Sequence, residues 1–469
     1  MQINPAVRSI GLFLLVMLIV GSIDSVRNLP ATALFGSSLV FFFIFSAIIF
    51  LIPTGLVSAE LSSAWTEQGG IYDWVRMAFG EKVALIAIWL QWINTMVWFP
   101  TILSFIAATV AFLIDPSLDE HKGYLITVIL VVFWTLTLLN FKGVRASAKF
   151  AGICGLVGMI FPMAVIIVLG LAWMSAGKPL QLTFTMNSML PHFDQVNSWI
   201  SLTAIMTAFL GMEVATVHVR NVVNAQKTFP KALIISVILI LFTMVFGSLS
   251  IAVVLPHDQI SLVDGVMRAF QAYLGGYHMP WLVPVLTLLL LIGSLGSMIN
   301  WIISPAKGLL RAAQHGYFPQ FLAKENSRGV PVRMLLLQAV IVSVICLAFL
   351  LMPSVNGSYW LLTSLSTQLY MIMYVFMFLA ALRLRYKYPL QARPFKIAGG
   401  NVGMWLITLL GIFGCVVTLI VGFFPPDSID VGGKLHYEIV FSAGIVAMTL
   451  PVVLLYFYKK IHSARQLLS

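Results

Sequence analysis

Four ionisable residues lie inside long apolar stretches of this sequence, where a charge is expensive. They are Asp24, Arg27, Glu60 and Glu213, and His218 follows the last of them closely. Placing an ionised side chain at the centre of a lipid bilayer costs about 2.5–3.5 kcal/mol on insertion scales. Residues that bear such a cost commonly bind a substrate, move a proton or pair with one another. These five residues are therefore the first candidates for chemistry.

Each of the five also has a structural alternative. Asp24 and Arg27 are three residues apart, so they can pair with each other instead of facing a ligand. Glu60 can bridge helices, and Glu213 can either brace a helix or exchange a proton during transport. His218 changes its charge between about pH 5 and 8, which suits a sensor, but it can also pack at a helix end. We therefore keep Glu213, His218 and Glu60 as candidates for proton coupling or gating.

The segments around Asp24 and Glu213 predict two broken helices. One apolar run is interrupted by GSIDSVRN at 21–28, and a later run by FLGMEVATVHV at 209–219. Interrupted helices at corresponding positions are the best sequence indication of a transporter's binding site. Free N–H groups at a half-helix amino terminus favour a carboxylate, and freed carbonyl groups favour an ammonium group. An α-amino acid carries both groups, which makes it the expected ligand.

Aromatic and polar side chains elsewhere in the apolar runs are candidates for the rest of such a cavity. They are Asn94, Trp98, Trp301, Tyr370 and Tyr374. Each of them can equally be an ordinary packing or membrane-interface residue.

The elements that must position these residues are membrane helices. Hydrophobic residues make up 60% of the chain and charged residues only 9%, against roughly a quarter charged in soluble domains. Apolar runs of about 20 residues, the length that crosses a bilayer, recur along the whole sequence. They predict an all-α membrane protein with twelve spans, at 8–34, 37–62, 83–113, 123–141, 150–175, 197–221, 230–255, 280–305, 332–352, 358–382, 403–424 and 436–458. The longest loops are expected at 176–196, 256–279 and 306–331.

The net charge of +11 is a signal of topology. The loops that share a side with the two termini carry most of the Lys and Arg residues. The opposite loops carry only Lys122, Lys178, Arg268 and Lys434. Because positive residues stay on the cytoplasmic side, both termini are expected in the cytoplasm. We expect the lipid bilayer and a small-molecule substrate as partners, and no nucleic acid.

Enzyme motifs are not found in the predicted spans. There is no HExxH, GxSxG or paired-aspartate arrangement, so no catalytic residue is proposed. Cys154, Cys346 and Cys415 lie far apart in apolar spans and are expected to pack as small hydrophobic residues. No metal-ligand spacing occurs, and neither a metal nor another cofactor is expected.

Several longer segments resemble one family of transporters. They are SLVFFFIFSAIIFLIPTGLVSAEL with EQGGIYDWVRMAFG, FLGMEVATVHVRNVVNAQKTFPKA, ISPAKGLLRAAQHGYFPQFLAKENSRGVPV, and RPFKIAGG with FFPPD. In this order they resemble the amino acid–polyamine–organocation superfamily and, within it, the glutamate/GABA antiporter family. The resemblance covers nearly the whole chain.

The resemblance implies a LeuT-type fold with broken helices 1 and 6. Residues 8–175 would form a first five-helix repeat, 197–384 a second, inverted repeat, and 403–458 two additional helices. The family's substrate site then corresponds to two sets of backbone groups, Gly21, Ser22 and Ile23 for the carboxylate and Phe209, Leu210 and Gly211 for the amino group. Many relatives have Gly-Ser-Gly in helix 1, where this chain has Gly-Ser-Ile-Asp followed by Arg27.

The function that the resemblance implies is exchange of amino acids across the inner membrane by alternating access. Arg27 would pair with an acidic substrate such as glutamate if it faces the ligand. A proton-coupled amino acid symporter is the alternative within transport, and a channel or receptor is an alternative of another class. The protein is expected to act as a monomer or homodimer.

Overall fold

Every regular element that the structure describes is a helix. A computed structural model describes residues 10–65, 70–141, 154, 156–191, 196–213 and 222–466. Within this part of the chain, Ile10 and Val222 form an isolated bridge and no longer strand is present. In lipid each backbone N–H and C=O needs a partner within its own segment, which explains why apolar runs of this length fold as helices.

The first half of the described chain alternates long helices with short helical turns. Its elements are α1 (Leu12–Ile23), η1 (Val26–Asn28), α2 (Leu29–Ala33), η2 (Gly36–Ser38), α3 (Leu39–Ser46), η3 (Ala47–Leu51), α4 (Ile52–Ala64), α5 (Ile71–Phe79), α6 (Glu81–Ile114), η4 (Pro116–Glu120), α7 (Lys122–Phe141), η5 (Leu156–Ile160), α9 (Phe161–Ser175), α10 (Met186–Met189) and α11 (Val196–Ala208).

The second half contains the longest helices. Its elements are α13 (Ala225–Val254), η7 (His257–Gln259), α14 (Gly265–Gly276), α15 (Leu282–Ala312), η8 (Ala313–Tyr317), η9 (Gln320–Ala323), α16 (Val332–Ile345), η10 (Cys346–Leu350), α17 (Val355–Lys387), α18 (Gly400–Val421) and α19 (Lys434–Gln466).

Eleven helical stretches in the described residues are long and apolar enough to cross a membrane. This is one fewer than the twelve that the sequence predicts. The predicted sixth span, 197–221, corresponds to a shorter apolar helix, Ser198–Ala208, and its residues 214–221 lie outside the described part. The chain is thus an integral membrane protein that crosses the bilayer many times.

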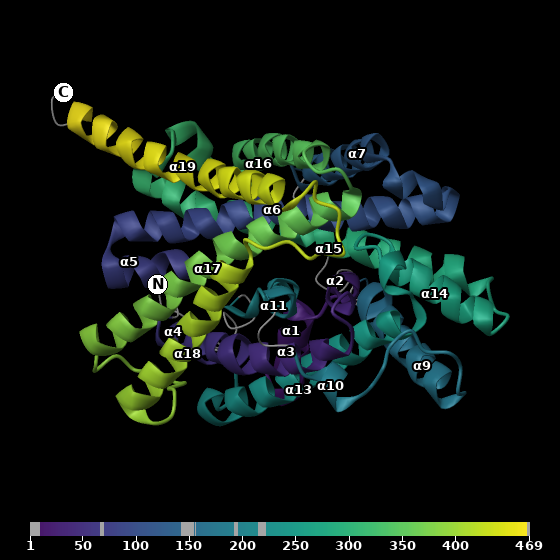
Figure 1. Cartoon of the computed structure of the whole chain (residues 1–469). Helices are drawn as coiled ribbons and strands as arrows, with labels where there is room; N and C mark the ends of the chain where they lie inside the picture. Colours follow the sequence, from purple (N-terminus) through teal and green to yellow (C-terminus); the bar gives the residue numbers. More distant parts are fainter. Residues whose placement is uncertain are drawn as a thin grey trace.

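Two long helices lie at the centre of the molecule and one lies at its edge. Of the most apolar 18 residues in each helix, 72% are buried in α6 and in α17, against 11% in α19. Figure 1 shows α6 and α17 running through the middle of the bundle, while α19 extends past it to the carboxyl terminus. Side chains on α6 and α17 can therefore be held rigidly around a site, and α19 presents its apolar side chains outward.

The first membrane stretch is broken where the sequence predicts. The α1 helix ends at Ile23, and Asp24 and Ser25 are extended, with ψ angles of 125° and 120°. Asp and Ser side chains compete with helical hydrogen bonding, which favours an interruption here. The helix resumes at α2 with Pro30 in its first turn, where the missing N–H of proline is tolerated.

The second break follows α11 and lies against the first. Phe209, Leu210 and Gly211 form a turn after Ala208, and Gly211 has a φ angle of +103°, which a residue with a side chain rarely adopts. A Cβ atom on Gly211 would lie 3.2 Å from the carbonyl oxygen of Ser22. The two interruptions therefore meet although they are far apart in the sequence.

The predicted loops contain regular structure that the sequence reading missed. Residues 256–279 contain η7 and the twelve-residue helix α14, and α15 continues to Ala312 within the predicted loop 306–331. These parts lie beyond the apolar runs, so hydropathy alone gave no sign of them. Cys154, Cys346 and Cys415 are buried and free, as predicted.

Candidate functional site

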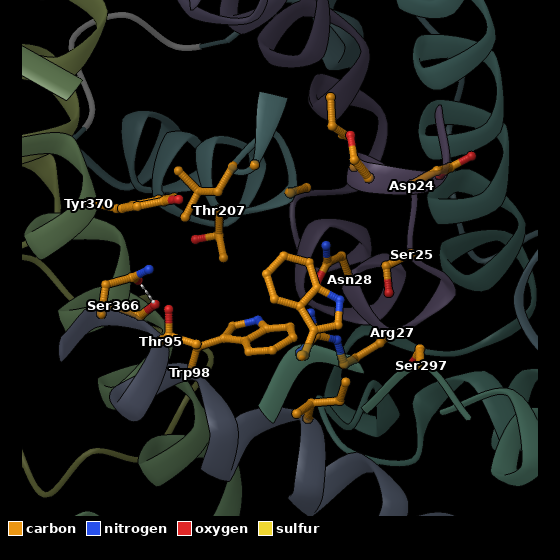
Figure 2. Close-up of a pocket in the computed structure, with 18 of the residues that line it drawn as sticks. Asp24, Ser25, Arg27, Asn28, Thr95, Trp98, Thr207, Ser297, Ser366 and Tyr370 are labelled. Atoms are coloured by element: carbon orange, nitrogen blue, oxygen red, sulfur yellow. Dashed lines mark hydrogen bonds between the residues drawn. The ribbon is translucent and has the colours of Figure 1, made fainter. Parts of the chain in front are cut away.

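A cavity of about 140 Å³ opens where the two helix breaks meet. Eleven of the twelve residues predicted to bind substrate line it: Gly21, Ser22, Ile23, Asp24, Arg27, Asn94, Trp98, Leu210, Gly211, Trp301 and Tyr370. The twelfth, Phe209, is fully buried and packs its ring against Phe43, with 5.7 Å between the ring centroids. Figure 2 shows side chains from several helices converging on this space.

Arg27 is a buried cation without a counter-ion. Its side chain is 6% exposed, and its Nε and Nη1 atoms have no hydrogen-bond partner. Among the described residues, no carboxylate lies within ion-pair distance of it. The guanidinium group lies over the ring of Trp98, 4.7 Å from its centroid, and Trp98 packs on Trp301. Such a cation–π contact offsets only part of the desolvation of a guanidinium group.

Asp24 is turned away from Arg27 and does not form the internal ion pair that the sequence allowed. Its Oδ2 atom accepts a hydrogen bond of 2.8 Å from Thr243 on α13. Its buried Oδ1 atom has no partner. Figure 2 shows the carboxylate directed away from the Arg27 side chain. The break in helix 1 therefore holds two separate charges, of which Arg27 is the one beside the indole rings.

Glu213 lies behind the cavity wall, in contact with a residue that lines the cavity. It is 4% exposed and accepts hydrogen bonds from the hydroxyl groups of Tyr370 and Tyr374. Gln91 approaches the same carboxylate at 3.4 Å. The Tyr374 hydroxyl also accepts the N–H of Gly211 at 3.1 Å, which links Glu213 to the break that follows α11.

Glu60 lies outside the cavity, in a buried ion cluster at the end of α4. It accepts hydrogen bonds from Arg385 on α17 and from the backbone N–H of Ile397 at 2.8 Å. The Nε atom of Arg393 lies 3.2 Å from its Oε1 atom. The structure thus separates Glu60 from the other candidates. His218 lies outside the described residues.

The structure adds polar residues that sequence reasoning missed. Ser25, Asn28, Thr95, Thr207, Ser297 and Ser366 also line the cavity. Ser366 donates a hydrogen bond of 2.5 Å to Asn94. Because Ser366 precedes Tyr370 by one helical turn, the i, i+4 spacing was a signal that could have found it. Ser297 precedes Trp301 by the same four residues, so the same signal could have found it.

The arrangement can hold a small polar molecule without changing it chemically. Interrupted backbone, hydroxyl and amide groups, two indole rings and one unpaired cation face a space of amino acid size. Binding at the meeting point of two broken helices is typical of membrane transporters. The fold and the cavity therefore define a multi-pass membrane transporter for small molecules.

Comparison with known proteins gives the family. Residues 10–447 match the family model described as amino acid permease, so the chain belongs to that family, within the amino acid–polyamine–organocation superfamily.

Individual relatives include exchangers. An uncharacterized transporter of Legionella pneumophila is 41% identical over 94% of this chain and 95% of its own length. A glutamate/gamma-aminobutyrate antiporter of Lactococcus lactis is 27% identical over 98% of this chain and 92% of its own. A probable agmatine/putrescine antiporter of the same species is 26% identical over 83% and 82%.

Proposed function

We propose that this protein exchanges amino acids across the bacterial inner membrane by alternating access. Glutamate or a related amino acid or amine is the expected class of substrate. The observation that carries the proposal is the meeting of the two helix breaks at one cavity, at Gly211 and Ser22. The naming of two relatives as antiporters supports exchange.

The proposed mechanism needs a pseudo-symmetric fold. We propose a LeuT-type arrangement of twelve helices, with inverted repeats at 8–175 and 197–384 and two further helices at 403–458. Both termini would then lie in the cytoplasm. The bridge between Ile10 and Val222 supports the proposed topology, since it places the beginnings of α1 and α13 on the same side of the bundle.

Within the cavity, we propose that Gly21, Ser22 and Ile23 hold the substrate carboxylate and that Leu210 and Gly211 hold the ammonium group. Arg27 then faces the side chain of the substrate. A carboxylate there would supply the counter-ion that Arg27 lacks, which supports an acidic side chain.

The test is counterflow in proteoliposomes. Vesicles loaded with unlabelled glutamate are expected to take up labelled external glutamate much faster than empty vesicles do. Adding decarboxylated and neutral amino acids outside, one at a time, defines the substrate class by competition. Equal uptake into loaded and empty vesicles would contradict exchange.

One observation favours a proton-coupled symporter as the second candidate. Glu213 is a buried carboxylate one tyrosine away from the cavity, where a proton can respond to the substrate. A symporter would accumulate substrate in empty vesicles when the outside is acidified. The same vesicles therefore decide between the two functions.

A further inference from the structure

A second buried group of charges lies outside the membrane-spanning segments. Asp119, on η4, is 3% exposed, and Asp264, just before α14, is 1% exposed. Arg268, in the first turns of α14, lies between them. Its Nε atom is 2.5 Å from Asp264 Oδ2, and its Nη2 atom is 3.7 Å from Asp119 Oδ2. Two carboxyl groups therefore share one guanidinium group.

Two oxygen atoms of this group have no partner. Asp119 Oδ1 and Asp264 Oδ1 are both buried without a hydrogen bond. If both residues were ionised, the cluster would bury one uncompensated negative charge, which is strongly unfavourable. Burial, together with the neighbouring charge of Asp264, raises the pKa of Asp119 to about 7, while Arg268 acts in the opposite direction. One bound proton would remove the excess charge and satisfy an oxygen atom.

The charged surroundings do not supply another cation to the pair. Glu120 and Asp258 lie near it and are exposed. Of the other titratable groups on the adjoining elements, three are directed to backbone carbonyl groups, Lys122 to Met352, Tyr124 to Ala107 and His257 to Leu34, and His121 is exposed. Among the residues that the structure describes here, Arg268 is the cation that lies within ion-pair distance of the two carboxyl groups, and it balances only one of them.

The pair ties a covering segment to the helices that form the cavity. The N–H of Leu262 donates a hydrogen bond of 2.9 Å to Asn356 at the start of α17. Gly265 lies so close to α2 that a Cβ atom there would be 3.1 Å from Pro30 Cβ. Residues 260–268 thus cover α2, the short helix that follows Arg27. A hollow of about 360 Å³, lined by Asp119 and Arg268 among others, gives water access to the Asp119 side of the pair.

We propose that Asp119 and Asp264 hold one proton between them, and that this proton keeps residues 260–268 closed over α2. When the pair loses the proton to water in the hollow, two carboxylates remain beside one guanidinium group. Their repulsion releases the segment on the side of the membrane opposite the amino terminus. The site is therefore a proton-binding latch, and it does not depend on which substrate is carried.

The sign of the pH dependence follows from the two states. Asp119 has an ordinary pKa of 3.8 when it is exposed and about 7 when the segment is closed. The closed state binds the proton more tightly, so acid favours closure. The ratio of closed to open protein falls by at most about tenfold per pH unit between these two values and is constant at higher pH.

Labelling of a single introduced cysteine tests the latch. Val266, in the first turn of α14, is fully buried, and Val266→Cys places a small thiol there. A membrane-impermeant thiol reagent should reach it only when the segment opens. The same cysteine in an Asp119→Asn background reports, at every pH, a pair that carries one negative charge, as the proton-bound pair does. The rate ratio of the two proteins cancels the pH dependence of the thiolate itself.

We expect labelling to be faster in the protein that keeps Asp119 than in the Asp119→Asn protein, and the ratio of the two rates to rise by up to about a hundredfold between pH 5 and pH 8. Asp264→Asn should behave in the same way as Asp119→Asn. Asp258→Asn, which removes an exposed carboxylate from the same hollow, is the matched control and should leave the rates unchanged. Equal rate ratios at pH 5 and pH 8 would overturn the proposal. Loss of folded protein in both Asp119→Asn and Asp264→Asn would do so too, since the pair with a single negative charge beside Arg268 must be the stable form.

Discussion

Two arginines are buried to nearly the same extent in this protein, and their surroundings are opposite. Arg27 is 6% exposed and Arg385 is 5% exposed. Arg385 donates hydrogen bonds to Glu60 and, at 2.9 Å, to the carbonyl oxygen of Gly400. Arg27 has a tryptophan ring and two nitrogen atoms without partners. A buried guanidinium group that the chain neutralises holds the chain together, whereas one beside a cavity is available to a ligand.

The two arginines also lie in different parts of the structure. The Glu60 cluster joins the end of α4 to α17 and to the segment after it, and none of its residues lines the cavity at the helix breaks. Arg27 lies at the break itself. If Arg27 binds the substrate as we propose, stability and substrate recognition depend on different arginines, and substitutions can separate the two roles.

The largest effect is expected when the saturated cluster is broken. Glu60→Gln leaves Arg385 and Arg393 buried beside each other with no negative charge. Removing one member of a buried ion pair costs about 3–5 kcal/mol. We expect a large fall in melting temperature or a loss of monodisperse protein, measured by thermal unfolding and size-exclusion chromatography in detergent.

Arg383→Gln is the matched control for that experiment. Arg383 lies two residues before Arg385 on the same helix but is exposed, and such surface changes usually stay within about 0.5 kcal/mol. If Glu60→Gln and Arg383→Gln melt at the same temperature, Glu60 is not a structural anchor and a gating role gains support.

The next largest effect is expected at Arg27, the arginine without a counter-ion. Arg27→Gln removes a buried charge that lacks a counter-ion, so the ligand-free protein should melt at the same or a higher temperature. Binding of an acidic amino acid should weaken by about 1.5–3 kcal/mol, the value of a hydrogen bond to a charged group. This corresponds to roughly 10- to 150-fold in the KM of exchange.

Arg27→Lys distinguishes charge from geometry in the same assay. Lysine keeps the charge but not the planar pair of N–H donors, so we expect an intermediate KM. Unaltered glutamate exchange in Arg27→Gln would contradict the pairing of Arg27 with the substrate while leaving exchange itself untouched.

A third prediction concerns the buried carboxylate that the tyrosines hold. Glu213→Gln keeps the shape of the side chain and removes its titration. If Glu213 carries a proton during transport, the exchange rate of the variant should change by no more than about twofold between pH 5 and 8. Tyr370→Phe, which removes one hydrogen bond but leaves the carboxylate, should retain the pH dependence. A full pH dependence in Glu213→Gln would exclude the proton role.

The sequence predicted the membrane helices and their breaks, but not the partners of the buried charges. Hydropathy located the membrane helices, and the polar interruptions located both breaks. An ionisable residue such as Asp24 is costly within an apolar helix, and a glycine such as Gly211 allows the backbone to leave the helical conformation. The residues that pair with the buried charges could not be predicted from the sequence. Arg385 and Arg393 lie far from Glu60 in the sequence, and no local spacing indicates that they meet it.

The same limit applies to Asp24 and Arg27. Their spacing suits a helical ion pair, but that rule holds only for residues on a continuous helix. Because the chain is extended at Asp24 and Ser25, the two side chains point to different helices. Asp119, Asp264 and α14 were also missed, since they lie in segments that hydropathy treats as loops.

The smallest expected effect tests the one bond that Asp24 makes. Thr243→Val removes the hydroxyl group that donates to Asp24 Oδ2 and keeps the shape of the side chain. Asp24 would then resemble Arg27, a charge with no partner from the chain, and the loss should be about 1–2 kcal/mol. Thr243→Ser keeps the hydroxyl group and should melt near the parent. A melting temperature of Thr243→Val equal to that of the parent would mean that Asp24 gains nothing from α13. The charge at the break would then have to be balanced from within the cavity, as we propose for Arg27.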